Sequence, residues 1–334
     1  MLNNLYSLLS CFVLALAISP MVFWILRKMK AGQNILEYVD NHKSKQGTLS
    51  MGGLIFIFAS ILSVVFFQND RMLANLTLII FASYGLLGFL DDFLKIKLKH
   101  NEGLKPYQKI IGQVGIAIII ALFIYNFGML GGNINIPYTN ISINISWWII
   151  PVVIVFFLAV TNSVNLTDGL DGLAGSVSLI IILTLGVLSY IKYTATLSSG
   201  VLETLSNEYL NLAIVCFGLS GAILVFLLFN CYPATIFMGD TGSLALGGFI
   251  ASVTAFLQEY LLLIVIGVAY VITALSSILQ VAYYKMTKKR IFLMAPFHHH
   301  LERLGLKESK IVGIYTIITL LICMSTIILY IIKM

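Results

Sequence analysis

The sequence contains little charge. Only 10% of its 334 residues are Asp, Glu, Lys or Arg, 59% are hydrophobic, and the mean hydropathy is +0.98. Soluble globular domains carry roughly 25% charged residues, so this composition excludes an ordinary soluble protein and predicts an integral membrane protein. We expect one membrane domain over residues 1–334, although the length would allow about two soluble domains.

Cysteine is also scarce. The four cysteines form no CxxC pair, so neither a disulfide framework nor a zinc site is predicted. Residues 1–4 lack the basic segment that opens a signal peptide. The first basic residue, Arg27, follows the apolar run. That run is therefore expected to be a retained helix with its N-terminus outside.

Apolar stretches dominate the rest of the chain. A membrane-spanning helix needs about 20 residues, and ten candidates are 3–26, 51–67, 73–91, 108–130, 146–163, 173–192, 209–229, 241–257, 261–283 and 311–332. The predicted fold is an all-α polytopic membrane protein with ten transmembrane helices. An even number of helices places both termini on one side. Residues 131–145 alternate apolar and polar side chains around a turn, which predicts a short outer β-hairpin.

The basic residues mark one side of the membrane. Seventeen of the 20 Lys and Arg residues fall within 27–50, 92–110 and 284–310. The positive-inside rule makes this side cytoplasmic and puts both termini outside. Topology and attraction to anionic lipid head groups then account for the net charge of +6. No nucleic-acid partner is predicted.

The motif GFLDDFLK at 88–95 places Asp91 and Asp92 at the end of an apolar run. A charge inside a bilayer costs about 3 kcal/mol, so such residues are rare and usually functional. On a helix, Lys95 shares a face with the pair. The two carboxylates could bind a divalent cation, or their repulsion could keep one as a proton acceptor. The structural alternative is a charged helix end that anchors at the interface.

Two further acidic motifs fall on the same predicted side. In NLTDGLDG at 165–172, Asp168 and Asp171 are three residues apart. Such acid-rich loops hold hydrated Mg²⁺ against phosphates, but the composition equally suits a plain turn. In FMGDTGS at 237–243, Asp240 stands where a helix should begin. It could cap that helix, or bind a metal beside backbone N–H groups that receive phosphate. Phe237 could stack on a base or merely pack.

The block APFHHHLE at 295–302 contains His298, His299 and His300. Consecutive histidines splay around a helix and cannot all face one metal, so a zinc site is not favoured. One or two of them could hydrogen-bond or donate a proton to a phosphate, and a polar interfacial loop is the alternative. Candidate diphosphate or sugar ligands in the first basic loop are Lys43, Lys45, Thr48 and Ser50.

The motifs GFLDDFLK, NLTDGLDGLAG and FMGDTGSLALGG occur in this order. Together they resemble the polyprenyl-phosphate N-acetylhexosamine-1-phosphate transferase superfamily, and the similarity covers essentially the whole chain. The histidine block resembles the phospho-N-acetylmuramoyl-pentapeptide-transferase branch more than the GlcNAc-1-phosphate branch. The chain departs from the family at 48–50, where Thr-Leu-Ser replaces the usual Thr-Pro-Thr. Loss of this proline should loosen the approach to the second helix.

The resemblance implies a reaction and a setting. Phospho-N-acetylmuramoyl-pentapeptide would pass from its UDP-linked donor to undecaprenyl phosphate, giving lipid I and UMP in peptidoglycan synthesis, with Mg²⁺ as cofactor. The enzyme would lie in the bacterial cytoplasmic (inner) membrane as a homodimer, with its site facing the cytoplasm. Its ninth helix would be broken, with an arm along the membrane. Nucleoside inhibitors would bind at the uridine site.

The same resemblance assigns roles to the motif residues. Asp240 and Asp92 would bind Mg²⁺, Asp91 would act as base for the lipid phosphate with Asp92 close by, and Lys95 would clamp phosphate. His299 would act on the donor phosphates. The remaining expected substrate contacts are Lys105, Asn165, Asp168, Asp171, Asn230, Phe237, Gly239, Gln280, His298 and His300.

Two other activities and two chemical routes are also compatible with these residues. The nearest alternative activity is a UDP-GlcNAc:undecaprenyl-phosphate GlcNAc-1-phosphate transferase. A more distant alternative is a cation-coupled transporter with the aspartates as ion sites, which the gathering of acids at one face disfavours. A one-step transfer and a route through a phospho-aspartate at Asp91 or Asp92 are both chemically possible.

Overall fold

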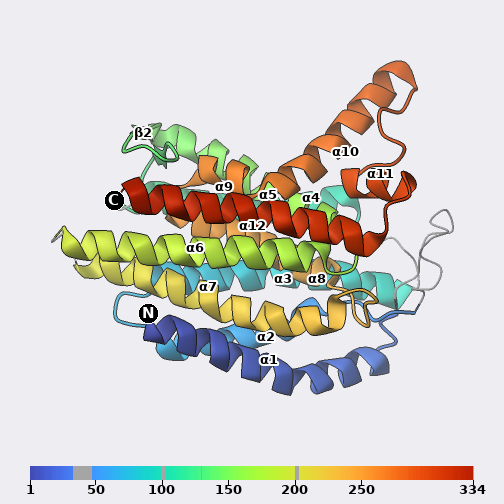
Figure 1. Ribbon diagram of the computed structural model, residues 1–334, viewed down its shortest axis with the longest axis horizontal. Helices are drawn as coiled ribbons and strands as arrows, with labels where there is room; N and C mark the ends of the chain where they lie inside the picture. Colours follow the sequence, from blue (N-terminus) through green and yellow to red (C-terminus); the bar gives the residue numbers. More distant parts are fainter. Residues whose placement is uncertain (33–46, 99–102, 129, 200–202, 334) are drawn as a thin grey trace.

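The computed structural model describes residues 1–32, 47–98, 103–128, 130–199 and 203–333. Long helices run side by side as a bundle (Figure 1). The helices, long and short, are α1 (Leu2–Lys28), α2 (Gly53–Ser60), α3 (Met72–Leu98), α4 (Pro106–Asn126), α5 (Ile149–Thr167), α6 (Leu173–Ser198), α7 (Glu203–Asn230), α8 (Gly239–Phe256), α9 (Tyr260–Ile266), α10 (Val268–Thr287), α11 (Phe297–Arg303) and α12 (Glu308–Lys333). Two 3₁₀ turns, η2 (Ile61–Phe66) and η3 (Ser146–Trp148), extend α2 and precede α5.

The apolar helices make this a multi-pass membrane protein. Among the described residues, seven helices are long and apolar enough to cross a membrane, or eight if the bent pair α9–α10 is one span. The predicted stretches 51–67 and 241–257 are helical but fall outside this set. The first forms only the short α2 and η2, and the second, α8, is rich in glycine, serine and threonine. The ten-span topology therefore stays a prediction.

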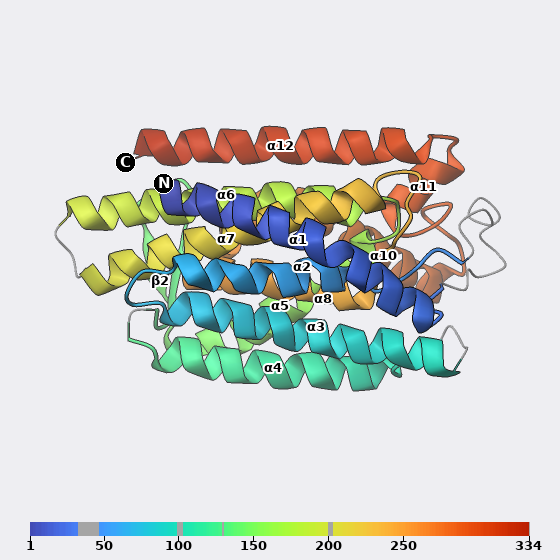
Figure 2. The same cartoon turned by 90° about the horizontal axis from the view of Figure 1, so that it is seen from below.

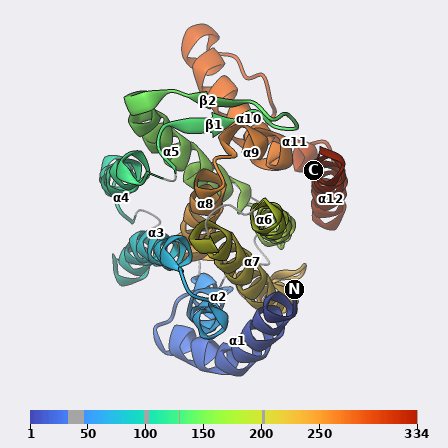
Figure 3. The same ribbon diagram turned by 90° about the vertical axis from the view of Figure 1, so that its left-hand side faces the viewer.

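Helix α8 lies at the centre of the bundle. All its residues from Thr241 to Phe256 are buried, and the view along the bundle shows α3, α5, α6 and α7 around it (Figure 3). Its small residues suit this position because they let neighbouring backbones approach closely. A Cβ atom on Gly88 of α3 would overlap the backbone carbonyl of Asp240. The start of α8 is thus held directly against α3.

Both chain termini lie at one end of the bundle (Figures 1 and 2), which agrees with an even number of crossings. The same end carries strands β1 (Asn133–Asn135) and β2 (Ser142–Asn144), which pair antiparallel and confirm the predicted hairpin. Buried Glu259 accepts hydrogen bonds there from Lys192 of α6, at 2.8 Å, and from the Tyr330 hydroxyl of α12, at 2.6 Å. These contacts join the hairpin end of α6, α9 and α12.

The predicted break in the ninth segment is confirmed. Helices α9 and α10 meet at Gly267 with a bend of 87°, and α10 leaves the bundle at a slant (Figure 1). The chain then returns through 288–296 to α11. There the backbone N–H of Phe297 donates to the Ser276 hydroxyl of α10 over 3.0 Å. The bend therefore brings the histidine block back to the end of the bundle opposite the termini.

Candidate active site

Three carboxylates meet at the end of the bundle opposite the termini. Asp91 and Asp92 come from α3, Asp240 comes from the first turn of α8, and one oxygen of each lies within 4.8 Å of the others. Asp91 and Asp92 are only 3% and 5% exposed. Oxygen ligands of this kind suit a hard divalent cation such as Mg²⁺. The residues present therefore fit the metal that the sequence motifs predict.

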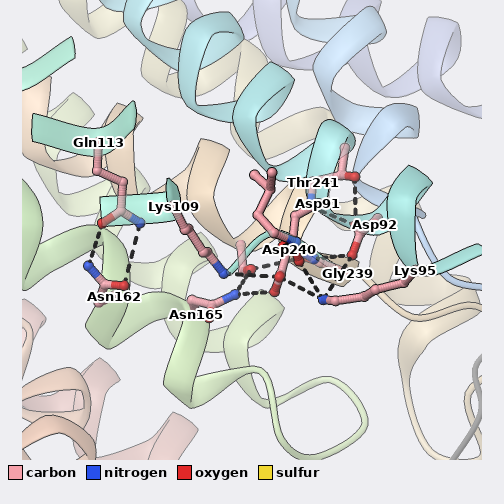
Figure 4. Close-up of polar contacts among 12 residues, drawn as sticks. Asp91, Asp92, Lys95, Lys109, Gln113, Asn162, Asn165, Gly239, Asp240 and Thr241 are labelled. Carbon is pink, nitrogen blue, oxygen red and sulfur yellow. Dashed lines mark hydrogen bonds and ion pairs between the residues drawn. The ribbon is translucent and has the colours of Figure 1, made fainter. Parts of the chain in front are cut away.

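Two lysines converge on one oxygen of Asp240. The amines of Lys95 and Lys109 lie 2.8 and 3.0 Å from Asp240 Oδ2 (Figure 4). Lys95 also lies 2.6 Å from Asp91 Oδ2, which confirms the predicted shared helix face. Cations this close to the carboxylates offset their mutual repulsion and can contact a phosphate that binds beside them. The site is thus a mixed cluster of opposite charges.

Lys109 is not among the predicted site residues. It lies in α4, one turn after Lys105, and the side chain of Lys105 is exposed at the start of that helix. The i,i+4 spacing from Lys105 is the sequence signal that could have found Lys109. The structure brings Lys109, rather than Lys105, to the aspartates.

Asp92 holds the N-terminus of α8 from outside that helix. Its carboxylate accepts hydrogen bonds from the Thr241 backbone N–H at 2.9 Å, the Thr241 hydroxyl at 2.7 Å and the Asp240 N–H at 3.2 Å. The first N–H groups of a helix have no partner within it, so a carboxylate from a neighbouring helix satisfies them. Asp240 itself is inside α8, whose N-terminus has no side-chain cap of its own. The interpretation of Asp240 as the N-cap is therefore wrong.

Asn165 links the second motif to this cluster. Its amide nitrogen donates to Asp240 Oδ1 at 2.6 Å and to the Ser243 hydroxyl at 2.8 Å. Both oxygens of Asp240 are therefore held, one by the lysines and one by Asn165. Ser243 is a further contact that is not among the predicted site residues, although it lies in the quoted FMGDTGS motif.

The acidic loop between α5 and α6 is held in place by hydrogen bonds of Asp171, which belongs to the loop, and of Asn230, which ends α7. Asp171 Oδ2 accepts from the Ala234 backbone N–H at 3.0 Å. Asn230 accepts from the Gly172 N–H at 3.0 Å and donates to the Ile236 carbonyl at 2.8 Å. Asp171 and Asn230 were predicted to contact substrate. In the structure both side chains bind backbone groups, and so they fix the shape of the loop.

Asp168 is affected directly by the cluster. Burial and the nearby charge of Asp240 raise the pKa of Asp168 to about 8. A carboxyl group with such a pKa carries a proton for much of the neutral range. Perturbed carboxyl groups gather at functional sites, which is consistent with the predicted position of Asp168.

The three histidines have different partners, but His298 and His299 lie close together, with ring centroids 4.4 Å apart. His298 is fully buried in α11, and its ring nitrogens have no hydrogen-bond partner among the described residues. His299 Nδ1 lies 2.6 Å from Glu302, and His300 Nδ1 accepts from the Leu293 N–H at 3.2 Å. A side chain on Gly169 would collide with the rings of His298 and His299, so these two lie against the acidic loop. Burial and the neighbouring His299 lower the pKa of His298 to about 3.

The other predicted contacts are placed less centrally. Ser50 lies beside Gly239, whose φ of +73° and proximity to Asp92 require glycine. Gln280 accepts from the N–H groups of 291 and 292, at 3.1 and 2.9 Å, and so supports that loop. Thr48 has no hydrogen bond to the aspartates within the described chain. Lys43 and Lys45 lie outside the described residues.

The segment that leads into α2 is paired on both sides. The Leu49 carbonyl accepts from the Phe237 N–H at 2.7 Å, and the Ser50 N–H donates to the Ala31 carbonyl at 2.8 Å. Phe237 is thereby fixed beside the start of α8 and is partly buried. Loosening by the absence of proline at 49 stays a prediction.

Known proteins resemble this chain over almost its full length. Residues 72–258 match the family model described as glycosyl transferase family 4. The phospho-N-acetylmuramoyl-pentapeptide-transferase of Clostridium perfringens (strain SM101 / Type A) is 46% identical over 316 residues, covering 93% of this chain and 92% of the relative. The enzyme of that name from Clostridium novyi (strain NT) is 43% identical, covering 96% and 94%. That of Clostridium kluyveri (strain NBRC 12016) is 41% identical, covering 97% and 98%.

The chain belongs to the phospho-N-acetylmuramoyl-pentapeptide-transferases of glycosyl transferase family 4. It is therefore an enzyme, a phosphotransferase, as the motifs predict. The family match from 72 to 258 contains α3 through α8 and so includes all three clustered aspartates, both lysines and Asn165. The histidines of α11 lie beyond that match.

Proposed function

We propose that this protein transfers phospho-N-acetylmuramoyl-pentapeptide from its UDP-linked donor to undecaprenyl phosphate, giving lipid I and UMP in peptidoglycan synthesis. The relatives' printed names support this assignment. The observation that carries the chemistry is the meeting of Asp91, Asp92 and Asp240 with two lysines at one end of a membrane bundle. Phosphoryl transfer depends mainly on positioning and charge stabilisation, which such a cluster provides.

The three carboxylates would hold Mg²⁺, which would supply charge neutralisation for the diphosphate when bound. Lys95 and Lys109 would contact phosphate oxygens beside Asp240. An oxygen of the lipid phosphate would attack the β-phosphorus of the donor, the bond to the bridging oxygen would break, and UMP would leave with that oxygen. Water is kept from the carboxylates of Asp91 and Asp92 by their burial.

Asp91 is the better candidate for the residue that faces the lipid phosphate. Its oxygens receive the Leu104 N–H, at 2.7 Å, and the Lys95 amine, at 2.6 Å, and its carboxyl group lies against that of Asp240. Asp92 receives three hydrogen bonds from the start of α8. Asp91 would therefore accept the proton of the lipid phosphate when that group binds protonated. Asp92 would keep Asp240 in place and offer its remaining lone pairs to the metal.

The donor would lie along the acidic loop and α11. Asn165, Asp168 and Phe237 would border the uridine and sugar, and His298 and His299 would face the donor from α11. Nucleoside inhibitors would compete there.

We also propose that the chain crosses the bacterial inner membrane ten times, with both termini outside and the site on the cytoplasmic face. The protein would form a homodimer.

Donor choice is tested by UMP release. The purified protein is supplied with undecaprenyl phosphate, Mg²⁺, and either UDP-N-acetylmuramoyl-pentapeptide or UDP-GlcNAc. Release with the first donor alone is expected, and release with UDP-GlcNAc alone would overturn the assignment. An Asp240→Asn protein that keeps UMP release but loses an ion-dependent flux would favour the transporter alternative.

The number of chemical steps is tested with the donor alone. A one-step transfer leaves no label on the protein when the donor carries a labelled β-phosphate and the lipid phosphate is omitted. Recovery of a labelled, acid-stable but hydroxylamine-sensitive phospho-protein would instead establish the route through an aspartyl phosphate.

A further inference from the structure

A second polar layer lies deeper in the bundle than the carboxylates. Gln113 of α4 and Asn162 of α5 exchange amide hydrogen bonds, Asn162 Nδ2 to Gln113 Oε1 at 2.8 Å and Gln113 Nε2 to Asn162 Oδ1 at 3.4 Å (Figure 4). Gln113 is fully buried. An unpaired amide in an apolar interior is costly, so each side chain fixes the other.

This amide pair stands next to the residues that hold Asp240. Lys109 precedes Gln113 by four residues on α4, and Asn162 precedes Asn165 by three on α5. Residues at these spacings share a helix face. The amide pair thus joins the same two faces that deliver Lys109 to Asp240 Oδ2 and Asn165 to Asp240 Oδ1.

Tyr84 of α3 connects this layer to α3 and α8. Its hydroxyl donates to the backbone carbonyl of Gln113 at 3.3 Å, and its ring stacks on Phe157 of α5 with centroids 6.2 Å apart. A Cβ atom on Gly248 of α8 would collide with the same ring. Tyr84 is fully buried in α3, seven residues before Asp91. It therefore contacts α4, α5 and α8 about two turns from the carboxylates.

Near the site, α4 is held by the Lys109–Asp240 ion pair, by the Leu104 N–H bond to Asp91 just before the helix, and by Gly112 against Leu87 of α3, and the amide pair adds a buried polar contact one turn deeper. The structure describes all of α4, and its buried residues are Gln113, Ala117, Ile120, Ala121 and Ile124. Gln113 is the polar member of that set and the one nearest Lys109. The others lie toward the hairpin end, so they fix the far half of the helix better than the half that carries the lysine.

We infer that Gln113 and Asn162 are positioning residues for the transfer reaction, and that their amide pair sets α4 so that the Lys109 amine reaches Asp240. The inference rests on the proposed role of Lys109 at the diphosphate. Neither amide is hydrogen-bonded to the carboxylates among the described contacts, so both would act through Lys109. A displacement of about 1 Å of a catalytic group can cost on the order of a hundredfold in rate.

The test compares Gln113→Leu, Asn162→Leu and the double Q113L/N162L protein in lipid nanodiscs, with kcat and KM from UMP release and apparent Tm from a thermal scan. Asn162→Leu leaves the buried Gln113 amide without its partner, and Gln113→Leu leaves Asn162 with its bond to the Leu158 carbonyl but an unpaired Oδ1, whereas the double variant removes both amides. We expect the double variant to recover Tm and still turn over about tenfold to a hundredfold more slowly than wild type. We expect KM for the donor to change little. The swapped Q113N/N162Q protein, which restores an amide pair, should regain part of kcat.

Two controls separate positioning from simple loss of stability. Ile124→Ala opens a cavity at the far end of α4 and should lower Tm without changing kcat below the unfolding temperature. In a Lys109→Gln background, Q113L/N162L should change kcat by less than about twofold, because residues that act through one group are non-additive.

Three results would overturn the inference. The double apolar variant could keep full kcat, its effect could multiply with that of Lys109→Gln, or Ile124→Ala could lower kcat as strongly. A fully active Lys109→Gln protein would also contradict the proposed role of Lys109. A loss of rate in Lys109→Gln with full rate in Q113L/N162L would leave the proposed function intact and reject only the positioning role.

Discussion

The neighbouring acids Asp91 and Asp92 differ in what they hold. Asp92 accepts three hydrogen bonds from the first turn of α8, whereas Asp91 contacts Lys95 and one backbone N–H of the chain before α4. In the proposed function, a pair of identical residues one position apart is therefore divided into a structural member, Asp92, and a reactive member, Asp91. Their order in the sequence does not show this division, because it depends on where α8 begins.

Removing the Asp92 carboxylate should destabilise the protein. Asp92→Ala leaves the buried N–H groups of Asp240 and Thr241 unpaired, and we expect a loss of about 2 kcal/mol in the free energy of unfolding. Asp91→Asn, which keeps an acceptor for Leu104, should lose activity with little change in stability. Thermal unfolding in nanodiscs and UMP release measure the two effects. Equal stability of Asp92→Ala and wild type would contradict the capping role.

Buried His298 should make stability depend on pH. Its pKa of about 3 in the folded protein lies below the ordinary value of 6.5, so the unfolded chain takes up the proton first as the pH falls. Stability should therefore drop as the pH decreases from about 6.5 toward 3, by roughly 1 kcal/mol per unit. His298→Gln should flatten this slope. An unchanged difference between pH 7 and pH 5 in the variant would show that another group is responsible.

At the scale of helices, the close contact between α3 and α8 brings Asp240 next to Asp91 and Asp92. Gly88 touches the backbone of Asp240, and no larger residue fits there without movement. Gly115 of α4 offers a matched comparison, since it is exposed and nothing lies within 4 Å of its added Cβ. A glycine-to-alanine substitution can therefore be compared at one crowded position, 88, and one open position, 115.

Gly88→Ala should separate the two helices, lower stability by about 1–3 kcal/mol and slow the reaction. Gly115→Ala should be neutral or stabilise α4 by up to about 1 kcal/mol, because alanine favours helix. Thermal unfolding and kcat of both proteins test this. Similar behaviour of the two variants would mean that the α3–α8 contact tolerates an added methyl group.

The predicted stretches correspond to helices or helix pairs, but their ends do not coincide. The stretch 73–91 became α3 (Met72–Leu98), because lysines and aspartates continue a helix even where hydropathy falls. The break at Gly267 was expected from family resemblance alone, and no composition change marks it. Hydrophobic pattern thus predicts which segments are helical better than it predicts where they end or turn.

The site was predictable where one motif supplies several groups. Asp91, Asp92, Lys95, Asn165 and Asp240 were expected and meet. Lys109 was grouped with the topology-determining charges, and Gln113 and Asn162 carried no local signal. Their importance depends on contacts between helices, which a single sequence does not encode in any fixed spacing.

For the whole molecule, the opposite placement of the site and the termini yields a test of orientation. Cys231 is exposed near the acidic loop, while the other three cysteines are buried. Position 140 is exposed in the hairpin turn. Two proteins are compared in intact cells: one carries Asn140→Cys and Cys231→Ser, and the other is the unchanged chain. A membrane-impermeant maleimide should label the first at position 140 and should not label Cys231 of the second. Permeabilisation should then expose Cys231, and the reverse pattern would invert the proposed topology.

The 87° bend has a consequence for the surrounding lipid. Helix α9, at about 10 Å, reaches only a third of the way through a hydrocarbon core of about 30 Å. Beyond it, α10 slants outward with exposed Ile278 and Tyr284 and a basic end. In a membrane, this outward slant would make the protein occupy more area in the leaflet on the side of the site than in the other. It should act as a wedge, and its insertion should be easiest where the membrane already curves toward that leaflet.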